Sequence, residues 1–241
     1  MSTAHSDVPR RERARTATIE EIKATALELM RETGTTDARF TDIARSMGMT
    51  PPALYRYFAD RDELLTALIT DAFDDLGRTV AAARDTVGEH DIGGRWVAAG
   101  EAYRQWARRE PQQFALIFGL PVPGYVAPQE GATTEAASRA MSQLAALFAE
   151  AHHTGKLRHA LIREVEPAFG RCAEGESKFG AIPSENFQAM LHAWASLHGF
   201  TCLEAFSHLD WMEPEARDAL FRAQVRAAAK AAGLPAPARV R

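Results

Sequence analysis

"RFTDIARSMGMTPPALYRYFADRDELL", residues 39–65, places two short helical patterns on either side of a glycine-containing turn. The first pattern has one apolar side and ends at Gly48, a residue type that readily adopts positive φ. That side consists of Ile43, Ala44 and Met47. The second pattern begins at Pro51, where a helix does not need the amide hydrogen that proline lacks, and Thr50 before it has the chemistry of an N-cap. Together these features predict a helix-turn-helix.

Longer helical patterns flank this motif. The N-terminal pattern predicts a helix from about Thr16 to Thr33, with apolar residues at helical spacing. Thr41 has the chemistry of an N-cap for the first short helix, and Asp60 for a helix that reaches about Val87. The last helix carries a long apolar stripe, made of Leu64, Leu65, Leu68, Ile69, Ala72, Phe73 and Leu76. We therefore expect a helical bundle built around the helix-turn-helix.

The second short helix has a polar outer side. Leu54 points inward, so the outer side is left to Arg56 and two tyrosines. In a helix-turn-helix this side enters the major groove of DNA, where Arg56 can reach a guanine edge or a phosphate. Tyr55 and Tyr57 can donate hydrogen bonds to phosphates, and Arg61 adds a charge close to helix amides. The alternative interpretation is a solvated helical hairpin at the edge of an all-α core.

The charge balance narrows where DNA could bind. The chain has 241 residues, a formal net charge of −4 and a pI of about 6.1, which argues against a generally basic surface. Any DNA contact must therefore come from a local basic patch. Arginines do cluster near the start of the chain, at Arg10, Arg11, Arg13 and Arg15. We expect this run to be a flexible arm that adds electrostatic affinity for DNA.

Several other classes of protein are disfavoured. Only Cys172 and Cys202 are present, which excludes a disulfide framework and a cysteine-rich zinc site. No apolar run resembles a leader or a membrane span, so we expect a cytoplasmic protein that contacts no membrane. His152, His153 and His159 lack acidic or cysteine partners at ligand spacing, which predicts no metal. No catalytic motif or cofactor motif is recognisable, so we expect neither an enzyme nor a bound cofactor.

The C-terminal half is rich in aromatic residues at helical spacing. The number of aromatics exceeds what a thin helical layer needs, so a ligand cavity among them is plausible. The candidate lining residues are Trp96, Tyr103, Phe114, Phe118, Met141, Phe148, Phe187, Met190, Leu191 and Trp194. The alternative is that most of them are plain core. Between them, the Pro- and Gly-rich "GLPVPGYVAP" predicts a long ordered connection.

Two helices near the C-terminus carry small residues on one side. Ser184 has the chemistry of a cap for the first, and the second begins after Pro214 and runs up to Gly233. Small residues at three- and four-residue spacing permit close helix crossing, which predicts a four-helix interface between two subunits. The alternative is that both helices cover the core of a monomer. After Gly233 we expect a disordered tail.

At residues 16–76 the chain resembles the TetR family of transcriptional regulators. The matching motif is "FTDIARSMGMTPPALYRYFADRDELL", with Arg61 where lysine is usual and Pro52 where Gly or Ala is commoner. Because proline has no amide hydrogen, Pro52 cannot donate a backbone hydrogen bond to DNA at that position. The resemblance implies an all-α fold. It also implies that DNA is contacted by Thr41, Thr50, Pro51, Pro52, Ala53, Tyr55, Arg56, Tyr57 and Arg61.

The second half, at residues 91–210, resembles more loosely the C-terminal effector domain called WHG, after a Trp, a His and a Gly. Here these residues match Trp194, His198 and Gly199. The resemblance implies an all-helical domain that binds small molecules and dimerises through its last two helices. From the residues alone, His198 could be a ligand contact or a satisfied interface histidine, and Cys202 fits an inert small apolar residue better than a redox sensor.

These inferences combine into one prediction. We expect a homodimeric regulator, most often a repressor in this family, that a small-molecule effector releases from a palindromic double-stranded operator. The expected divisions are a flexible arm at 1–15, a helix-turn-helix domain at 16–62, an effector and dimerisation domain at 63–232, and a flexible tail at 233–241. Two alternatives remain. A dry, packed C-terminal core would favour a DNA-binding protein that senses no effector, and a polar titratable cluster would favour a DNA-tethered enzyme.

Overall fold

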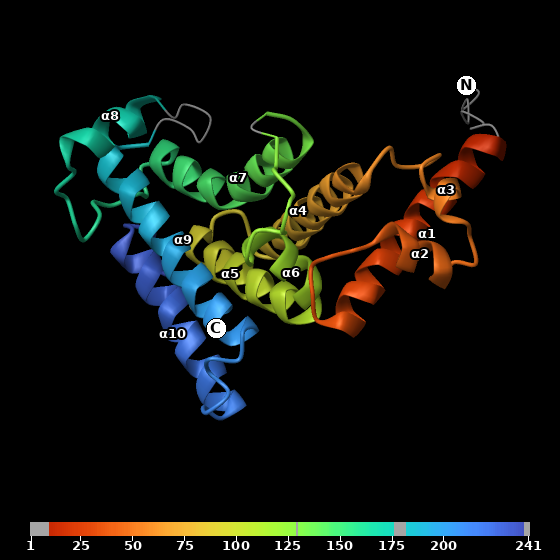
Figure 1. The fold of residues 1–241 in the computed structure, drawn as a ribbon. Coiled ribbons are helices and arrows are strands. Elements are labelled where there is room, and N and C mark those ends of the chain that lie inside the picture. The colour runs from red at the N-terminus through yellow and green to blue at the C-terminus, as the bar shows by residue number, and fades with distance from the viewer. Residues whose placement is uncertain (1–9, 129, 176–181, 239–241) are drawn as a thin grey trace, which may run out of the picture. The chain divides into compact units, whose positions relative to one another are not determined.

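The computed structural model describes residues 10–128, 130–175 and 182–238, and these residues form helices and connections without a strand (Figure 1). The residues outside these ranges include most of the expected arm and the last three residues of the expected tail. The side chain of Cys172 also lies outside the description. No helix in the described part of the chain combines the length and apolar composition that crossing a membrane requires.

The chain divides into two compact units. The N-terminal unit comprises residues 1–72 and 112–134, and the C-terminal unit comprises residues 73–111 and 135–241. Helices α4, α6 and α7 each contribute to both units. The grouping differs from the expected division after residue 62, because residues 112–134 cluster with the helix-turn-helix.

The N-terminal unit begins with α1 (Arg10–Thr33), α2 (Phe40–Ser46) and α3 (Pro51–Leu54), and continues into α4 (Arg61–Asp85). Its apolar core consists of Ile22, Ala26, Met30, Ile43, Ala44, Leu54, Phe58, Leu64, Leu65 and Leu68, all nearly inaccessible to solvent. The expected helix-turn-helix is present as α2 and α3. Between them Gly48 has a φ of +64°, and the amide of Met49 donates to the carbonyl of Ala44 at 2.8 Å.

The helix starts were only partly predicted. Asp60 caps α4 as expected, since its carboxylate accepts from the amide of Glu63 at 2.8 Å. Thr50 is the N-cap residue of α3, but its side chain makes no capping hydrogen bond. The expectation for Thr41 was wrong, because α2 begins at Phe40 and its N-cap residue is Arg39. Helix α1 begins at Arg10 rather than Thr16. The arginine run is therefore helical, because helix formation does not require an apolar face in the first turns.

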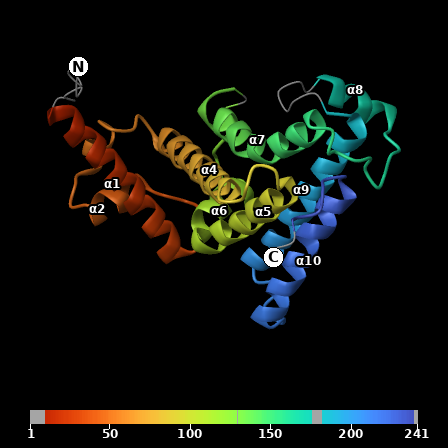
Figure 2. The ribbon, with the colours of Figure 1, turned by 180° about the vertical axis from the view of Figure 1, so that it is seen from behind.

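The C-terminal unit is a bundle around α5 (Ile92–Arg109), α9 (Ser184–Ala205) and α10 (Pro214–Ala231), which pack against one another (Figures 1 and 2). Helix α6 (Pro111–Phe118), which is mostly in the N-terminal unit, precedes α7 (Ala132–His153), and α8 (Pro167–Gly175) packs on α9. Trp96 and Phe148 lie at the centre of the bundle, with edge-to-face rings 5.7 Å apart.

Two expectations at the ends of this unit were wrong. Ser184 is the first helical residue of α9, the N-cap residue is Pro183, and no side chain caps the helix. The segment after Gly233 is ordered as far as residue 238. Leu234 is buried, and the amide of Ala238 donates to Asp91 Oδ1 at 3.0 Å. The buried leucine holds this part of the expected tail against the bundle.

Candidate nucleic-acid interface and candidate ligand site

The outer side of α3 is exposed. Pro51, Pro52 and Arg56 are open to solvent, and Tyr55 has an exposed fraction of 57% with its ring 5.1 Å from that of Phe40. The side chain of Arg56 forms no ion pair or hydrogen bond within the described residues. Thr41 and Thr50 are also exposed, whereas Ala53 and Tyr57 are half-buried. The structure therefore gathers eight of the nine sequence-predicted DNA contacts in α2, in α3 and beside α3.

Arg15 supports the end of α3 from the first helix. Its guanidinium lies 5.7 Å from the centre of the Tyr57 ring, and its Nη2 donates to the carbonyl of Arg56 at 3.4 Å. The earlier arginines of the run, Arg10, Arg11 and Arg13, are exposed on the first turns of α1. The N-terminal unit thus carries the local concentration of positive charge that DNA binding requires of an acidic chain.

The ninth predicted contact, Arg61, is engaged inside the unit. Its Nε and Nη2 donate to Asp37 Oδ1 at 3.1 and 2.7 Å, and its Nη1 donates to the carbonyl of Pro123 at 3.4 Å. The side chain keeps an exposed fraction of 28%. A guanidinium that donates three hydrogen bonds to two acceptors in different segments has a fixed orientation. From its position at the start of α4, Arg61 was expected to be free to contact DNA. Its partners Asp37 and Pro123 lie 24 and 62 residues away in the sequence, and no local pattern indicated them.

The predicted ligand-lining residues are divided between the two units. Phe114 and Phe118 belong to the N-terminal unit, where their rings lie 5.3 Å apart. In the C-terminal unit, Trp96 and Phe148 are completely buried, and the indole of Trp96 donates to the carbonyl of Val225 at 3.0 Å. Tyr103, Phe187 and Met190 are buried as well, whereas Met141, Leu191 and Trp194 are partly exposed. Trp96 and Phe148 therefore match the plain-core alternative, and the partly exposed residues remain open to a ligand.

A polar cluster joins α5 to α9 inside this unit. The Tyr103 hydroxyl lies 2.7 Å from His198 Nδ1, Cys202 Sγ lies 3.4 Å from His198 Nε2, and the imidazole stacks on Trp194 with ring centres 5.0 Å apart. Burial raises the pKa of the Tyr103 hydroxyl and of the Cys202 thiol, and lowers the pKa of His198. All three groups are therefore neutral near pH 7, so the thiol lacks the ionised form that a nucleophile needs.

The sequence contained a signal for this cluster. Trp194, His198 and Cys202 follow one another at four-residue spacing, which places them on one side of α9. His198 was considered as a ligand contact or an interface histidine, and Cys202 as a small apolar residue. The hydrogen bond to Tyr103, 95 residues earlier in the chain, is the part that the pattern did not contain.

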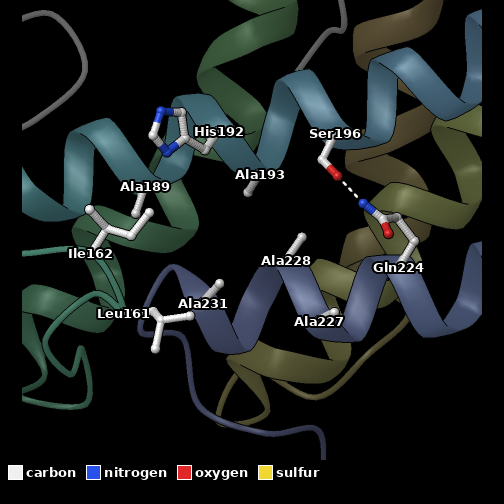
Figure 3. Close-up of a pocket in the computed structure, with 10 residues that line it drawn as sticks. All are labelled: Leu161, Ile162, Ala189, His192, Ala193, Ser196, Gln224, Ala227, Ala228 and Ala231. Carbon is white, nitrogen blue, oxygen red and sulfur yellow. Dashed lines mark hydrogen bonds between the residues drawn. The ribbon is translucent and has the colours of Figure 1, made fainter.

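A groove with a volume of about 280 Å³ runs between α9 and α10 (Figure 3). Five alanines make up much of its wall, and Gln224 donates to Ser196 across it. Leu161 and Ile162 lie at one end with exposed fractions of 80% and 55%. The lining residues are Leu161, Ile162, Ala189, His192, Ala193, Ser196, Gln224, Ala227, Ala228 and Ala231. None of them was a predicted ligand residue, although the spacing of small residues did indicate close helix crossing here.

A second depression, of about 510 Å³, lies at the start of α9. His159 Nδ1 is 2.6 Å from Glu185 Oε1, and Arg163 Nε is 3.6 Å from the same carboxylate. Together these contacts lower the pKa of Glu185, with the hydrogen bond from His159 as the largest cause. Across the described ranges, no three His, Cys, Asp or Glu side chains gather as a metal site.

Comparison with known proteins identifies the family. Residues 22–68 match the family described as bacterial regulatory proteins, tetR family, and residues 96–228 match the tetracyclin repressor-like C-terminal domain. The HTH-type transcriptional regulator Rv1816 of Mycobacterium tuberculosis is 34% identical over 193 residues, which cover 78% of this chain and 82% of that protein.

Solved structures agree with this assignment. The crystal structure of the regulatory protein SCO4313 superimposes with a TM-score of 0.74 at 33% identity, over 92% of this chain and 98% of that one. RolR, solved in complex with the ligand resorcinol, shares the fold with a TM-score of 0.52 at 16% identity, over 94% of this chain and 98% of its own. The chain therefore belongs to the TetR family of DNA-binding transcriptional regulators.

Proposed function

We propose that this regulator is a homodimeric repressor that releases a palindromic operator when a small molecule binds to its C-terminal unit. The observation that carries the proposal is the exposed outer side of α3, where the side chain of Arg56 has no partner among the described residues. If the guanidinium of Arg56 were buried or ion-paired inside the protein, it could not bind DNA. A guanidinium without a partner, beside the exposed Tyr55 and the half-buried Tyr57, is instead suited to a phosphate backbone and a base edge.

The reading face consists of Thr41, Thr50, Pro51, Pro52, Ala53, Tyr55, Arg56 and Tyr57. In this proposal Arg56 reads a guanine, the tyrosine hydroxyls bind phosphates, and the small residues at the start of α3 let the helix approach the groove floor. Pro51 and Pro52 offer no amide donor, and the amide of Ala53 donates to the carbonyl of Thr50 at 2.8 Å, so the start of α3 contacts the groove through side chains and not through amides. Arg10, Arg11 and Arg13 add sequence-independent attraction.

The dimer interface in this proposal is the surface of α9 and α10. The alanine-lined groove lets a second pair of helices approach closely, and large apolar side chains are exposed where α9 turns into α10. These are Leu203, Phe206, Trp211 and Leu220, with exposed fractions of 46%, 45%, 77% and 45%. Such a surface is costly to leave in water, and a two-fold interface would place the same patch of both subunits in contact.

An effector site in the C-terminal unit is supported by the partly exposed Trp194, by the polar cluster beside it, and by the fact that this fold holds resorcinol in RolR. One observation favours the other candidate, a regulator that senses no small molecule. Trp96 and Phe148, both predicted to line a cavity, are completely buried in the core. One experiment separates the two candidates: thermal unfolding against a metabolite library. A compound at ~100 times its dissociation constant should add about 2.7 kcal/mol, and no shift with any compound would favour the second candidate.

The DNA proposal is tested by selecting sites from a random duplex pool with the purified full chain. We expect two half-sites related by a two-fold axis and separated by about 34 Å, one turn of the duplex. A single half-site, or selection without any preferred sequence, would contradict the proposal. Footprinting of the selected site then locates both copies of α3.

The dimer is tested by sedimentation of two arginine variants. Ala227→Arg places a long charged side chain in the groove and should give monomers that bind the operator weakly. Ala219→Arg is the control, because Ala219 is exposed on the same helix but does not line the groove. If both variants sediment as dimers, α9 and α10 do not form the interface.

A further inference from the structure

The connection after α6 contains a tight turn that belongs to the N-terminal unit. Val122 is buried at 5% exposure, and the amide of Tyr125 donates to the carbonyl of Val122 at 3.0 Å. Gly124 has a φ of +78°, which few other residue types adopt. Leu120 and Val126, on either side, have exposed fractions of 88% and 85%. Residues 122–125, which we call the clasp turn, are therefore held by the buried Val122 and by their internal hydrogen bond, whereas the neighbouring Leu120 and Val126 are exposed.

The clasp turn holds the first two turns of α4. The Tyr125 hydroxyl lies 3.0 Å from Thr66 Oγ1, and the carbonyl of Pro123 accepts from Arg61 Nη1 at 3.4 Å. The same guanidinium donates twice to Asp37, in the connection between α1 and α2. Arg61 thus links two connections that lie far apart in the sequence. Movement of the clasp turn would displace the start of α4.

The start of α4 is in turn tied closely to α3. Phe58 donates its amide to the carbonyl of Leu54, the last residue of α3, at 3.1 Å. The carboxylate of Glu63 accepts from the amide of Ala59, and the amide of Glu63 donates to Asp60. Since Leu54 and Phe58 are also buried, the segment between α3 and Arg61 has little freedom to move. The orientation of α3 therefore follows the orientation of the first turn of α4.

We propose that Arg61, Thr66 and Tyr125 are positioning residues, and that the clasp turn sets the angle at which α3 meets DNA. This inference rests on the proposed function, since it needs an operator. It assigns Arg61 a different role from the phosphate contact expected from its sequence position. In the structure its donors are directed at Asp37 and Pro123, and a guanidinium with those bonds cannot turn toward a phosphate without breaking them.

A double-mutant cycle tests the clasp. Tyr125→Phe and Thr66→Val each remove one hydroxyl and keep the size of the side chain. Each should lower affinity for the operator selected by the wild type about three- to tenfold, as expected for one lost neutral hydrogen bond. The double variant should lose no more than either single variant, because both break the same bond. Binding to unrelated duplex DNA should not change, a result that separates positioning of α3 from a general loss of folded protein.

The control is Val126→Ala on the same connection, whose exposed side chain should leave operator affinity at the wild-type value. Unchanged or increased operator affinity in both single variants, or losses that add in the double variant, would overturn the proposal. If the wild type selects no operator, the proposed function fails before the clasp is tested, so the two failures are distinguishable.

Arg61 gives a second, independent test. A phosphate contact would make Arg61→Ala reduce the slope of log affinity against log salt by about 0.9, and Arg61→Lys would restore affinity. A positioning role predicts lower operator affinity in both variants with the wild-type salt slope, because lysine cannot donate to Asp37 and Pro123 in the same geometry. A reduced slope in Arg61→Ala together with rescue in Arg61→Lys would assign Arg61 to DNA and overturn the proposal.

Discussion

Helices α3 and α5 use their polar side chains in opposite ways. Helix α3 has four residues, and the side chains on and after its outer side mostly lie in solvent. Helix α5 has 18 residues, and Arg95, Arg104 and Trp106 on it are bonded to carboxylates inside the C-terminal unit. Trp106 donates to Asp75 at 2.8 Å, and Arg104 donates to Glu204 through two nitrogens at 2.6 Å each. Polar side chains that are bonded inside the protein stabilise the fold, and polar side chains without an internal partner are available to bind another molecule.

The largest effect that tests this comparison is expected at Arg104. The side chains of Arg104 and Glu204 each have an exposed fraction of 7%. Its Nη1 also lies 2.8 Å from Asp218, and its guanidinium lies 4.8 Å from the centre of the Phe221 ring. Arg104→Ala leaves a buried carboxylate without its cation, which should cost about 3–5 kcal/mol of unfolding free energy. Urea denaturation at a fixed protein concentration measures the loss.

The matched control for Arg104 is Arg108 on the same helix. Its side chain has an exposed fraction of 53% and lies 3.6 Å from Asp218, so Arg108→Ala should cost less than about 1 kcal/mol. Adding Glu204→Gln to Arg104→Ala should recover part of the loss, because the uncompensated charge is removed. Equal losses for both arginines, or no recovery, would show that α5 is not held by this buried network.

The opposite result is expected at Arg56. Arg56→Ala should weaken operator binding by about 1–3 kcal/mol and relax the preference at one position of each half-site. Its unfolding free energy should stay within about 0.5 kcal/mol of the wild type, because the side chain has no partner among the described residues. Fluorescence anisotropy on the selected operator and on single-base variants measures both effects. A loss that is equal for all sequences would mean that Arg56 holds only phosphate.

The glycine turn sharpens the comparison further, because α3 depends on the turn for its position. Gly48 has a φ of +64° and open space around an added Cβ, so Gly48→Ala should cost about 1–2 kcal/mol from backbone strain alone. Gly88 also has open space but a φ outside the left-handed region, so Gly88→Ala should stay within about 0.5 kcal/mol of the wild type. Thermal unfolding compares the two variants, and equal stability would contradict the assigned role of the turn.

The two regions also differ in how far the sequence could predict them. The helix-turn-helix was predictable because its signals are local: Gly48 ends α2, Pro51 begins α3, and Asp60 caps α4 within a few residues. The start of α1 was missed because the apolar pattern begins only at Ile19, whereas the helix already includes residues 10–15, which are polar apart from Ala14. An apolar pattern shows where a helix packs and not where its backbone bonds begin.

The contacts of the C-terminal unit could not be predicted in the same way. The indole of Trp96 bonds to Val225, 129 residues later, and no local pattern specifies that pairing. The contact between Tyr125 and Thr66 in the N-terminal unit is also non-local, since it joins residues 59 apart. The number of aromatics did not distinguish Trp96, which is completely buried, from Trp194, which is partly exposed. Composition counts the aromatics of a bundle, and only packing decides which of them meet solvent.

The smallest expected effect concerns His198, a titratable group that is partly buried in the C-terminal unit. Its neighbours include the Tyr103 hydroxyl, the Cys202 thiol and the Trp194 ring. Burial lowers the pKa of His198 and raises the pKa of Tyr103 and of Cys202, so neither the hydroxyl nor the thiol becomes an anion beside the imidazole between pH 5.5 and about 7.5. In that range the unfolded chain binds a proton at His198 before the folded chain does. Protonation therefore favours unfolding, and stability should fall as the pH drops through about 6.5.

Thermal unfolding at a series of pH values measures this decrease. His198→Gln removes the titrating group, so its stability should fall less steeply between about pH 7 and 5.5 than that of the wild type. Tyr103→Phe should keep the wild-type decrease, because burial and not the hydroxyl is the cause of the lowered His198 pKa. If His198→Gln follows the wild-type curve, the imidazole is accessible enough to be protonated in the folded protein. His198 would then be comparable to the accessible polar side chains of α3 and not to the buried, bonded side chains of α5.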